Sequence, residues 1–311
     1  MEIIKELRQK SANLKRRIVL PEAYDQRVRQ ASEIIAKEEI AEVILLEKEK
    51  IKPQDKKRYV ETLFQMRRDR GMTLEEAERV LDNPLYYAGM MVSLGEADGF
   101  VAGACTTTPE VIRAAIRCLG VEERIGFVFS CFIMILEDKN FGENGVYVFA
   151  DCGVIPDPDF QQLAQIAIHT ADFSKDVLGF LPRVALLSYS TKGSSKVGPV
   201  EKVKKAVELA NKIRPDLLID GELQVDAAIV SEVAKIKFLD SPVGGKANIL
   251  IFPNLESGNI GYKLVQRLAK ARAIGPLLLG LKKACSDLSR GCSVDDIIDC
   301  VAVSSILSVK K

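Results

Sequence analysis

The sequence has few of the side chains on which several common catalytic mechanisms depend. Its 311 residues include one histidine and no tryptophan. The histidine, His169, lies between Ile168 and Thr170 in an apolar stretch with helical spacing, where such a side chain is usually structural. A Ser-His-Asp or Cys-His mechanism would have to use it. Because none of the motifs described below contains His169, we do not expect either mechanism.

The cysteines lack the spacing of a metal site or a disulfide framework. There are seven: Cys105, Cys118, Cys131, Cys152, Cys285, Cys292 and Cys300. No two of them form a Cys-x-x-Cys pair, and their number is odd. We therefore expect neither a zinc site nor a set of disulfides, and we predict no metal ligands.

Long apolar runs and a strong net charge are also missing. The longest apolar run, residues 127–136, is interrupted by Ser130 and is too short to span a bilayer. The first six residues include three charged side chains and lack the apolar core of a signal peptide, so we expect a cytoplasmic protein. Lys and Arg total 44 against 43 for Asp and Glu, which argues against a nucleic-acid partner.

Short apolar segments that alternate with helical patterns indicate an α/β protein. The expected strands include residues 18–22, 42–46, 97–104, 183–187, 217–222 and 248–252, and residues 127–136 and 146–151 are expected to form a hairpin. No Gly-x-Gly-x-x-Gly follows the first two strands, so a dinucleotide fingerprint is absent. We expect surface loops at residues 48–57 and 188–198, and a helix from Ile260 after a loop at residues 253–259.

The stretch from Asp287 to Asp296 combines a hydroxyl, a guanidinium, a thiol and carboxylates. Ser293 with Asp296 three positions later predicts a capping box at the start of a helix. Ser289 and Arg290 would then lie on the turn before it. Unpaired backbone N–H groups at a helix start bind anions, and a guanidinium matches phosphate oxygens. A second such start is expected at Thr108, as N-cap, with Pro109 in the first turn.

Four long motifs in a fixed order make the chain resemble a known family. They are residues 187–194 (LSYSTKGS), 220–228 (DGELQVDAA), 252–263 (FPNLESGNIGYK) and 287–292 (DLSRGC). They resemble motifs of the phosphate acetyltransferases (phosphotransacetylases) of the phosphate acetyl/butyryltransferase family, and the likeness runs through nearly the whole chain. That family moves an acetyl group between coenzyme A and inorganic phosphate.

The resemblance implies two α/β/α domains with a cleft between them, similar to the isocitrate/isopropylmalate dehydrogenase fold. The first domain would comprise residues 1–125 and 281–311, and the second residues 126–280. Direct transfer within a ternary complex is implied, with the coenzyme A thioester as a substrate and with no resident cofactor. A homodimer and an acetate kinase as metabolic neighbour are implied in the same way.

The resemblance also implies roles for single residues. Ser289 would donate a hydrogen bond to the developing oxyanion, Arg290 would neutralise charge, and Asp296 would accept the thiol proton. The implied substrate-binding residues are Arg67, Arg113, Arg267, Ser190, Thr191, Lys192 and Gly193. Residues expected near the site are Cys292, Thr106, Thr107 and Asn259. The family often has histidine in place of Thr106 and asparagine in place of Ser286. The helix start and Arg290 could lower the pKa of Cys292, yet we interpret this residue as structural.

Three other functions stay open at this level. A phosphate butyryltransferase shares the fold and the chemistry, and one methylene changes discrimination by only about 1–3 kcal/mol. A metal-dependent decarboxylating dehydrogenase of similar fold would need a carboxylate cluster, for which Asp220, Glu222 and Asp226 are close in sequence. A non-catalytic coenzyme A-binding relative is the third, although Ser289, Arg290 and Asp296 are all present.

Overall fold

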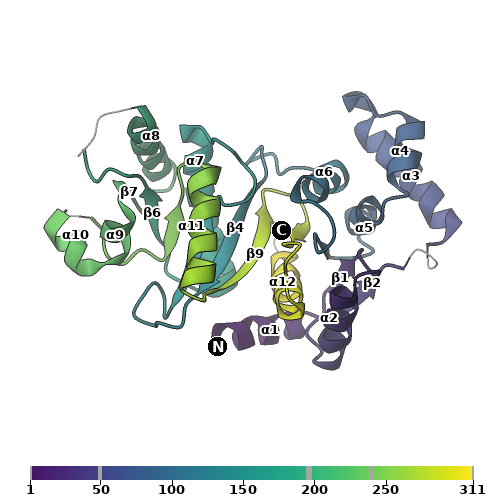
Figure 1. Ribbon diagram of the computed structural model, residues 1–311. Helices are drawn as coiled ribbons and strands as arrows, with labels where there is room; N and C mark the ends of the chain where they lie inside the picture. The colour runs from purple at the N-terminus through teal and green to yellow at the C-terminus, as the bar shows by residue number, and fades with distance from the viewer. Residues whose placement is uncertain (1, 48–50, 194–197, 238–240, 310–311) are drawn as a thin grey trace. The chain divides into compact units, whose positions relative to one another are not determined.

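The computed structural model describes residues 2–47, 51–193, 198–237 and 241–309. The chain divides into two compact units (Figure 1). Unit 1 comprises Met1–Phe127 and Gly275–Lys311, and unit 2 comprises Val128–Ile274. The resemblance implied domain boundaries at 125/126 and 280/281. The division of the protein into two domains stays a prediction. The expected α/β class is confirmed, since both units combine strands with packed helices.

Unit 1 contains a parallel set of strands whose carboxyl ends lie at one edge. Its strands are β1 (Arg17–Leu20), β2 (Glu42–Leu45), β3 (Gly99–Ala102) and β10 (Ala284–Asp287), in the order β2-β1-β3-β10. Each neighbouring pair is parallel, and β10 also pairs antiparallel with β9 (Arg272–Leu279). Ala102 of β3 is in register with Asp287 of β10. The loops that follow β1, β3 and β10 therefore leave the same edge, where ligand sites of open α/β sheets gather.

The helices of unit 1 form two packed groups. They are α1 (Glu2–Leu14), α2 (Gln26–Lys37), α3 (Pro53–Arg67) with a 3₁₀ turn (Arg68–Arg70), α4 (Leu74–Val80), α5 (Pro84–Ser93), α6 (Thr108–Leu119) and α12 (Val294–Leu307). The apolar helix α12 packs on α1, α2 and the strands β1, β3 and β10, as expected for a closing helix of the first domain. Arg8 of α1 donates to Asp299 of α12 over 2.8 Å. The second group pairs α5 with α6 and adds α3 and α4.

Unit 2 contains the expected hairpin and a parallel set beside it. Its strands are β4 (Phe129–Ile135), β5 (Val146–Ala150), β6 (Arg183–Leu187), β7 (Leu218–Leu223) and β8 (Ile249–Ile251), in the order β4-β5-β8-β6-β7. Only the β4–β5 pair of this set is antiparallel. Its helices are α7 (Phe160–Phe173) with a π-helical turn (Ser174–Leu178), α8 (Gly198–Ile213), α9 (Val225–Ile229), α10 (Ser231–Lys237) and α11 (Leu255–Leu268). Phe132 and Tyr262 stack in its core with ring centroids 4.2 Å apart.

Two expected loops are partly helical. Helix α3 begins at Pro53, within the expected loop 48–57, because proline fits the first turn of a helix; residues 48–50 lie outside the described residues. Helix α11 begins at Leu255 rather than at Ile260. Asn254 caps it by accepting a hydrogen bond from the Ser257 N–H over 2.9 Å. The apolar pattern from Ile260 therefore marked the packed part of the helix and missed its start.

Two structural features are absent from the part of the chain that the structure describes. None of its helices is long and apolar enough to cross a membrane. Within the same residues, no group of three or more His, Cys, Asp or Glu side chains could hold a metal ion.

The contact between α5 and α6 allows a stability test. A Cβ at Gly89 would lie 2.7 Å from the Cβ of Cys118. Alanine gains about 0.8–1 kcal/mol in helix propensity, whereas overpacking costs about 1–3 kcal/mol. We expect Gly89→Ala to lower the free energy of unfolding in urea by about 1 kcal/mol. Gly198→Ala, where the added Cβ meets no described atom within 4 Å, should change it by less than about 0.5 kcal/mol. Equal stability of both variants would contradict the close contact.

Candidate functional site

We call residues 288–293, between β10 and α12, the signature turn. Ser289, Arg290 and Gly291 are exposed on it. The Ser293 N–H donates to Asp296 Oδ2 over 2.8 Å, and the Asp296 N–H donates to Ser293 Oγ over 3.2 Å. The capping box predicted from the sequence is confirmed.

The backbone N–H groups of the signature turn are largely paired inside the turn itself. Gly291 N donates to Ser289 Oγ over 3.3 Å, and Cys292 N donates to the Ser289 carbonyl over 2.9 Å. The Ser293 N–H is occupied by Asp296. The expectation that unpaired N–H groups of this turn bind an anion is therefore wrong for these three. An anion bound here would need donors other than these three, and the Ser289 hydroxyl and the Arg290 guanidinium are exposed on the same turn.

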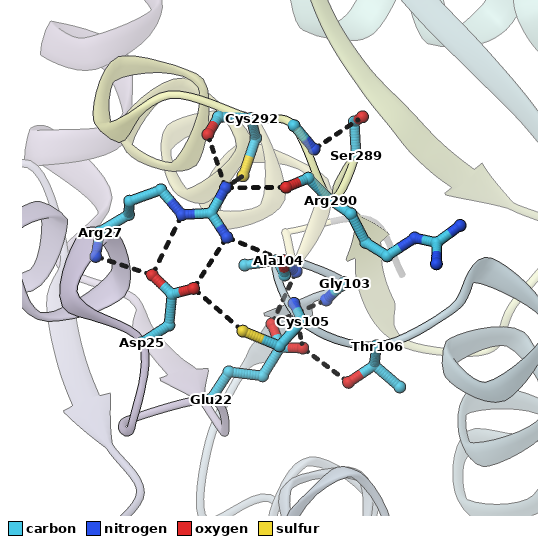
Figure 2. Close-up of polar contacts among 11 residues, drawn as sticks. Glu22, Asp25, Arg27, Gly103, Ala104, Cys105, Thr106, Ser289, Arg290 and Cys292 are labelled. Carbon is cyan, nitrogen blue, oxygen red and sulfur yellow. Dashed lines mark hydrogen bonds and ion pairs between the residues drawn. The ribbon is translucent and has the colours of Figure 1, made fainter.

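A buried carboxylate holds the loop that follows β3. Glu22 follows β1 and is 3% exposed. It accepts hydrogen bonds from the N–H groups of Gly103 (2.9 Å), Ala104 (2.8 Å) and Cys105 (3.0 Å) and from the Thr106 hydroxyl (2.6 Å) (Figure 2). Glu22 thus fixes the backbone of residues 103–105 and the side chain of Thr106. The expected near-site residue Thr106 lies at this loop through that bond.

A second charged group joins the start of α2 to the signature turn. Asp25 caps α2 and binds the Arg27 guanidinium at Nε (3.1 Å) and Nη2 (2.7 Å). Arg27 also donates to the carbonyls of Ala104 (2.8 Å), Arg290 (2.9 Å) and Cys292 (2.9 Å) (Figure 2). The Arg27 guanidinium holds the pKa of Asp25 well below its usual range, and Asp25 in turn raises the pKa of Arg27. The pair therefore stays ionised at neutral pH.

Asp287, the last residue of β10, is a fully buried carboxyl group. Its Oδ2 accepts a hydrogen bond from the Thr108 hydroxyl, whereas its Oδ1 has no hydrogen-bond partner among the described residues. Burial raises the pKa of Asp287 to about 7, although the bond from Thr108 opposes that shift. Gly103 lies against Oδ1, where a Cβ would come within 2.3 Å, and its φ of +113° also favours glycine. Asp287 thus packs between the loop after β3 and the start of α6.

The N-cap of α6 is Thr107, so the prediction of Thr108 is wrong. The N–H and the hydroxyl of Thr107 both donate to Glu110, over 3.1 and 2.6 Å. The Thr108 hydroxyl cannot act as the cap because it binds Asp287, which is distant in sequence. The expected near-site residue Thr107 therefore lies at the start of α6. Arg113, one turn further along α6, is exposed.

The Cys292 thiol is buried at the signature turn. Its sulfur lies 3.9 Å from Arg27 Nη1. Burial raises the pKa of Cys292 to about 11, and the nearby Arg27 only partly offsets it. From the sequence, the helix start and Arg290 could lower the pKa of Cys292. The structure shows the opposite direction, because desolvation outweighs the nearby positive charge. A thiol with this pKa is a weak nucleophile at neutral pH, which agrees with its interpretation as structural.

Arg67 binds the opposite end of α6 from Thr107. Its guanidinium is buried and donates to the carbonyls of Ile116 and Arg117, the latter over 2.6 Å. Burial lowers the pKa of Arg67, and the charge of Arg70 adds to that effect. The structure therefore does not place Arg67 in the hydrogen-bond network of the signature turn. Its role in substrate binding stays a prediction.

Apart from Arg67 and Arg113, the expected substrate-binding residues belong to unit 2. In the loop after β6, the Ser190 hydroxyl and the Gly193 N–H donate to Glu222, over 3.1 and 2.7 Å. Lys192 forms an ion pair with Asp220, and Thr191 accepts from the Gln224 N–H over 3.0 Å. This loop is thus held by the residues that begin the 220–228 motif. Residues 194–197 of the expected loop lie outside the described residues.

Two further expected residues are on α11. Asn259 donates from its side chain to the Cys152 carbonyl over 3.1 Å. Arg267 is exposed in the last turn of the helix. Because α11 begins at Leu255, Asn259 lies within the helix and not in a loop before it. The roles of Asn259 and Arg267 at the substrate site stay predictions.

Sequence reasoning missed the residues that support the signature turn: Glu22, Asp25, Arg27 and Asp287. A usable signal was present for Glu22, which is the last residue of the predicted strand 18–22. Charged residues at the carboxyl ends of parallel strands commonly lie in the site. The strand β10 itself was not expected, so Asp287 was not predicted to lie at the end of a strand. Beside it, Ser286 is buried, with its hydroxyl 2.7 Å from that of Ser304.

The raised pKa of Asp287 predicts a pH-dependent stability. Between the unfolded pKa of about 3.9 and the folded pKa of about 7, the folded state binds the proton more tightly. The free energy of unfolding should therefore fall as pH rises through this range. The Asp287→Asn variant lacks this loss. As pH rises from 5 to 8, its free energy of unfolding in urea should therefore increase by about 2 kcal/mol relative to that of the unchanged protein.

The matched control for that experiment is Asp216→Asn. Asp216 is exposed, and Arg214 lowers its pKa, so it titrates below pH 5. Its variant should show no such gain between pH 5 and pH 8. A parallel pH response of the Asp287→Asn variant and the unchanged protein would show that Asp287 is not protonated near neutrality.

The burial of Cys292 predicts a small catalytic effect on its removal. Cys292→Ala keeps the carbonyl that accepts from Arg27 and removes only the sulfur. We expect phosphate-dependent release of coenzyme A to stay within about threefold of the unchanged protein, because a buried thiol with a raised pKa is a weak nucleophile. A loss of a hundredfold or more in a folded variant would identify the thiol as a reacting group.

Comparisons with known proteins assign the chain to a family. A family model described as "Phosphate acetyl/butaryl transferase" matches residues 2–305. The phosphate acetyltransferase of Thermoanaerobacterium thermosaccharolyticum is 43% identical, with 98% of this chain and 99% of that protein covered. A phosphotransacetylase from Streptococcus pyogenes has a crystal structure that matches with a TM-score of 0.91 and 38% identity, over 99% of this chain and 98% of that one. The chain belongs to the phosphate acetyl/butyryltransferase family.

Proposed function

We propose that this acyltransferase is a phosphate acetyltransferase, which interconverts acetyl-CoA and phosphate with coenzyme A and acetyl phosphate. Relatives that match nearly the full chain at 43% identity bear the name phosphate acetyltransferase. The observation that carries the proposal is the signature turn. It presents the Ser289 hydroxyl and the Arg290 guanidinium to solvent at the carboxyl edge of the parallel strands, with its backbone already fixed by Arg27.

The proposed reaction is a direct transfer in a complex that contains both substrates. In one direction the sulfur of coenzyme A attacks the carbonyl carbon of acetyl phosphate, the C–S bond forms, and the C–O bond to phosphate breaks. Ser289 donates a hydrogen bond to the oxygen on which charge develops, and Arg290 neutralises the departing phosphate. Phosphate is a good leaving group, so positioning and charge neutralisation supply most of the rate.

Asp296 accepts the thiol proton in this proposal. A free thiol has a pKa of about 8.5 and a free aspartate about 3.9, so complete transfer before the attack would be uphill by roughly 6 kcal/mol. The proton therefore moves to Asp296 as the sulfur attacks, while Arg290 favours the thiolate. The carboxylate keeps its capping bond to Ser293, which holds it at the start of α12.

The two roles of Asp296 can be separated by substitution. The amide oxygen of Asp296→Asn can still accept from the Ser293 N–H, whereas Asp296→Ala loses both this half of the capping box and the base. We expect the Asn variant to lose about 10²–10⁴-fold in kcat with little change in KM for coenzyme A. The Ala variant should also lose about 0.5–2 kcal/mol of stability. Undiminished kcat in the folded Asn variant would remove Asp296 from the mechanism.

Thiol release from acetyl-, propionyl- and butyryl-CoA, each with and without inorganic phosphate, tests the function. Phosphate-dependent release that is fastest with acetyl-CoA is the expected result. A clear preference for butyryl-CoA would make the protein a phosphate butyryltransferase with the same mechanism. No phosphate-dependent release from any of the three would overturn the proposal in favour of a non-catalytic coenzyme A-binding protein.

Further parts of the proposal concern substrate contacts and context. Arg67, Arg113, Arg267 and residues 190–193 are proposed to bind the substrates, in keeping with the family resemblance. The protein is proposed to act as a cytoplasmic homodimer without a resident cofactor or metal. An acetate kinase is the proposed metabolic neighbour, because it would consume or supply acetyl phosphate.

A further inference from the structure

The Arg27 guanidinium contacts three segments of unit 1 that are far apart in the sequence. These are the start of α2, the loop after β3 and the signature turn (Figure 2). Arg27 and Arg290 are separated by 263 positions along the chain. Arg27 itself follows β1, so it lies at the edge where the parallel strands end. No motif in the sequence singled it out.

Every N–H donor of this guanidinium has a protein acceptor. An arginine side chain offers five N–H donors in a rigid plane. Nε donates to Asp25 Oδ1 (3.1 Å), and Nη2 donates to Asp25 Oδ2 (2.7 Å) and to the Ala104 carbonyl (2.8 Å). Nη1 donates to the carbonyls of Arg290 and Cys292, each over 2.9 Å. The five donors are thus matched by five acceptors, and none is left for a substrate.

The bonds to Arg290 and Cys292 lie on either side of Gly291 in the signature turn. A single planar group therefore fixes two carbonyls of this turn relative to the Ala104 carbonyl of the loop after β3. The Arg290 side chain extends away from Arg27, although its carbonyl is bound by it (Figure 2). Without Arg27, two carbonyls of the turn would lose their charged donor, and hydrogen bonds from a charged donor are stronger than neutral ones.

We infer that Arg27 is a positioning residue, which sets the backbone of the signature turn and so aims Ser289 and Arg290 at the reacting groups. Asp25 holds the guanidinium in the required plane from the opposite side. Arg27 does not contact substrate. The inference rests on the proposed phosphate acyltransfer for its kinetic consequences, but its structural part can be measured separately.

The variant Arg27→Lys tests this role, because lysine keeps the charge but lacks the fork that reaches five acceptors. Arg214→Lys is a matched control. Arg214 also binds an aspartate with both Nε and Nη2, each over 2.8 Å, and its side chain is 30% exposed against 32% for Arg27. It differs from Arg27 in that its hydrogen-bond partners among the described residues are two carboxylates, those of Asp172 and Asp216, and no backbone carbonyl.

Hydrogen–deuterium exchange of the peptide that covers residues 288–293 measures the positioning directly. Arg27→Lys should raise exchange there at least tenfold at an unchanged circular dichroism spectrum, and Arg214→Lys should leave it unchanged. If Arg27→Lys does not fold, Asp25→Asn replaces it, since it leaves the guanidinium in place but removes its charged partner. Unchanged exchange in a folded Arg27 or Asp25 variant would overturn the inference, whatever reaction the protein catalyses.

Kinetics then separate positioning from substrate contact. Arg27→Lys should lower kcat at least tenfold and change KM for coenzyme A by less than threefold, with the same loss for 3′-dephospho-CoA. Combined with Ser289→Ala, it should add little to the loss caused by Ser289→Ala alone, because both act through the same turn. A raised KM for coenzyme A that disappears with 3′-dephospho-CoA would show that Arg27 binds the coenzyme phosphate, and would overturn the inference.

If the unchanged protein released no thiol from any acyl-CoA, the proposed function would fail by itself. The exchange experiment would still decide the structural role of Arg27.

Discussion

The loops that follow the strands of a parallel sheet contain backbone N–H and C=O groups that need hydrogen-bond partners. In unit 1, two charged side chains serve as partners for several of these groups. Glu22 accepts from three successive N–H groups of the loop after β3. Arg27 donates to carbonyls of that loop and of the signature turn. Both side chains follow β1, the strand next to β3. The position of Ser289 and Arg290 therefore depends on pairing between segments from both ends of the chain.

The same edge carries a group that lowers stability. Asp287 is buried with a pKa raised to about 7, and one of its oxygens has no partner among the described residues. A buried carboxyl without full hydrogen bonding is unfavourable in its charged form. Gly103 is needed beside it, since any larger residue would meet Oδ1. Such local costs are common next to functional sites, where geometry is kept at the expense of stability.

The signature turn differs from a simple helix start in the way its backbone N–H groups are used. Three of its N–H groups are used within the turn or by the capping box. A phosphate at this turn would then be recognised by side chains, and a guanidinium can bind two phosphate oxygens at once. A backbone fixed by hydrogen bonds, with exposed polar side chains on it, is a suitable arrangement for stabilising charge that develops during a reaction.

The sequence by itself determined the α/β class, the β4–β5 hairpin, the Ser293–Asp296 capping box and the family. These features depend on local periodicity, on contacts three residues apart, or on motifs that stand intact in the chain. Only the tertiary structure decided that Thr107 caps α6, because the Thr108 hydroxyl binds Asp287, 179 positions away. It likewise decided the partners of Arg27 and the burial that raises the pKa of Cys292. Hydrogen bonds and desolvation between distant segments leave no periodic pattern, so sequence spacing could not predict them.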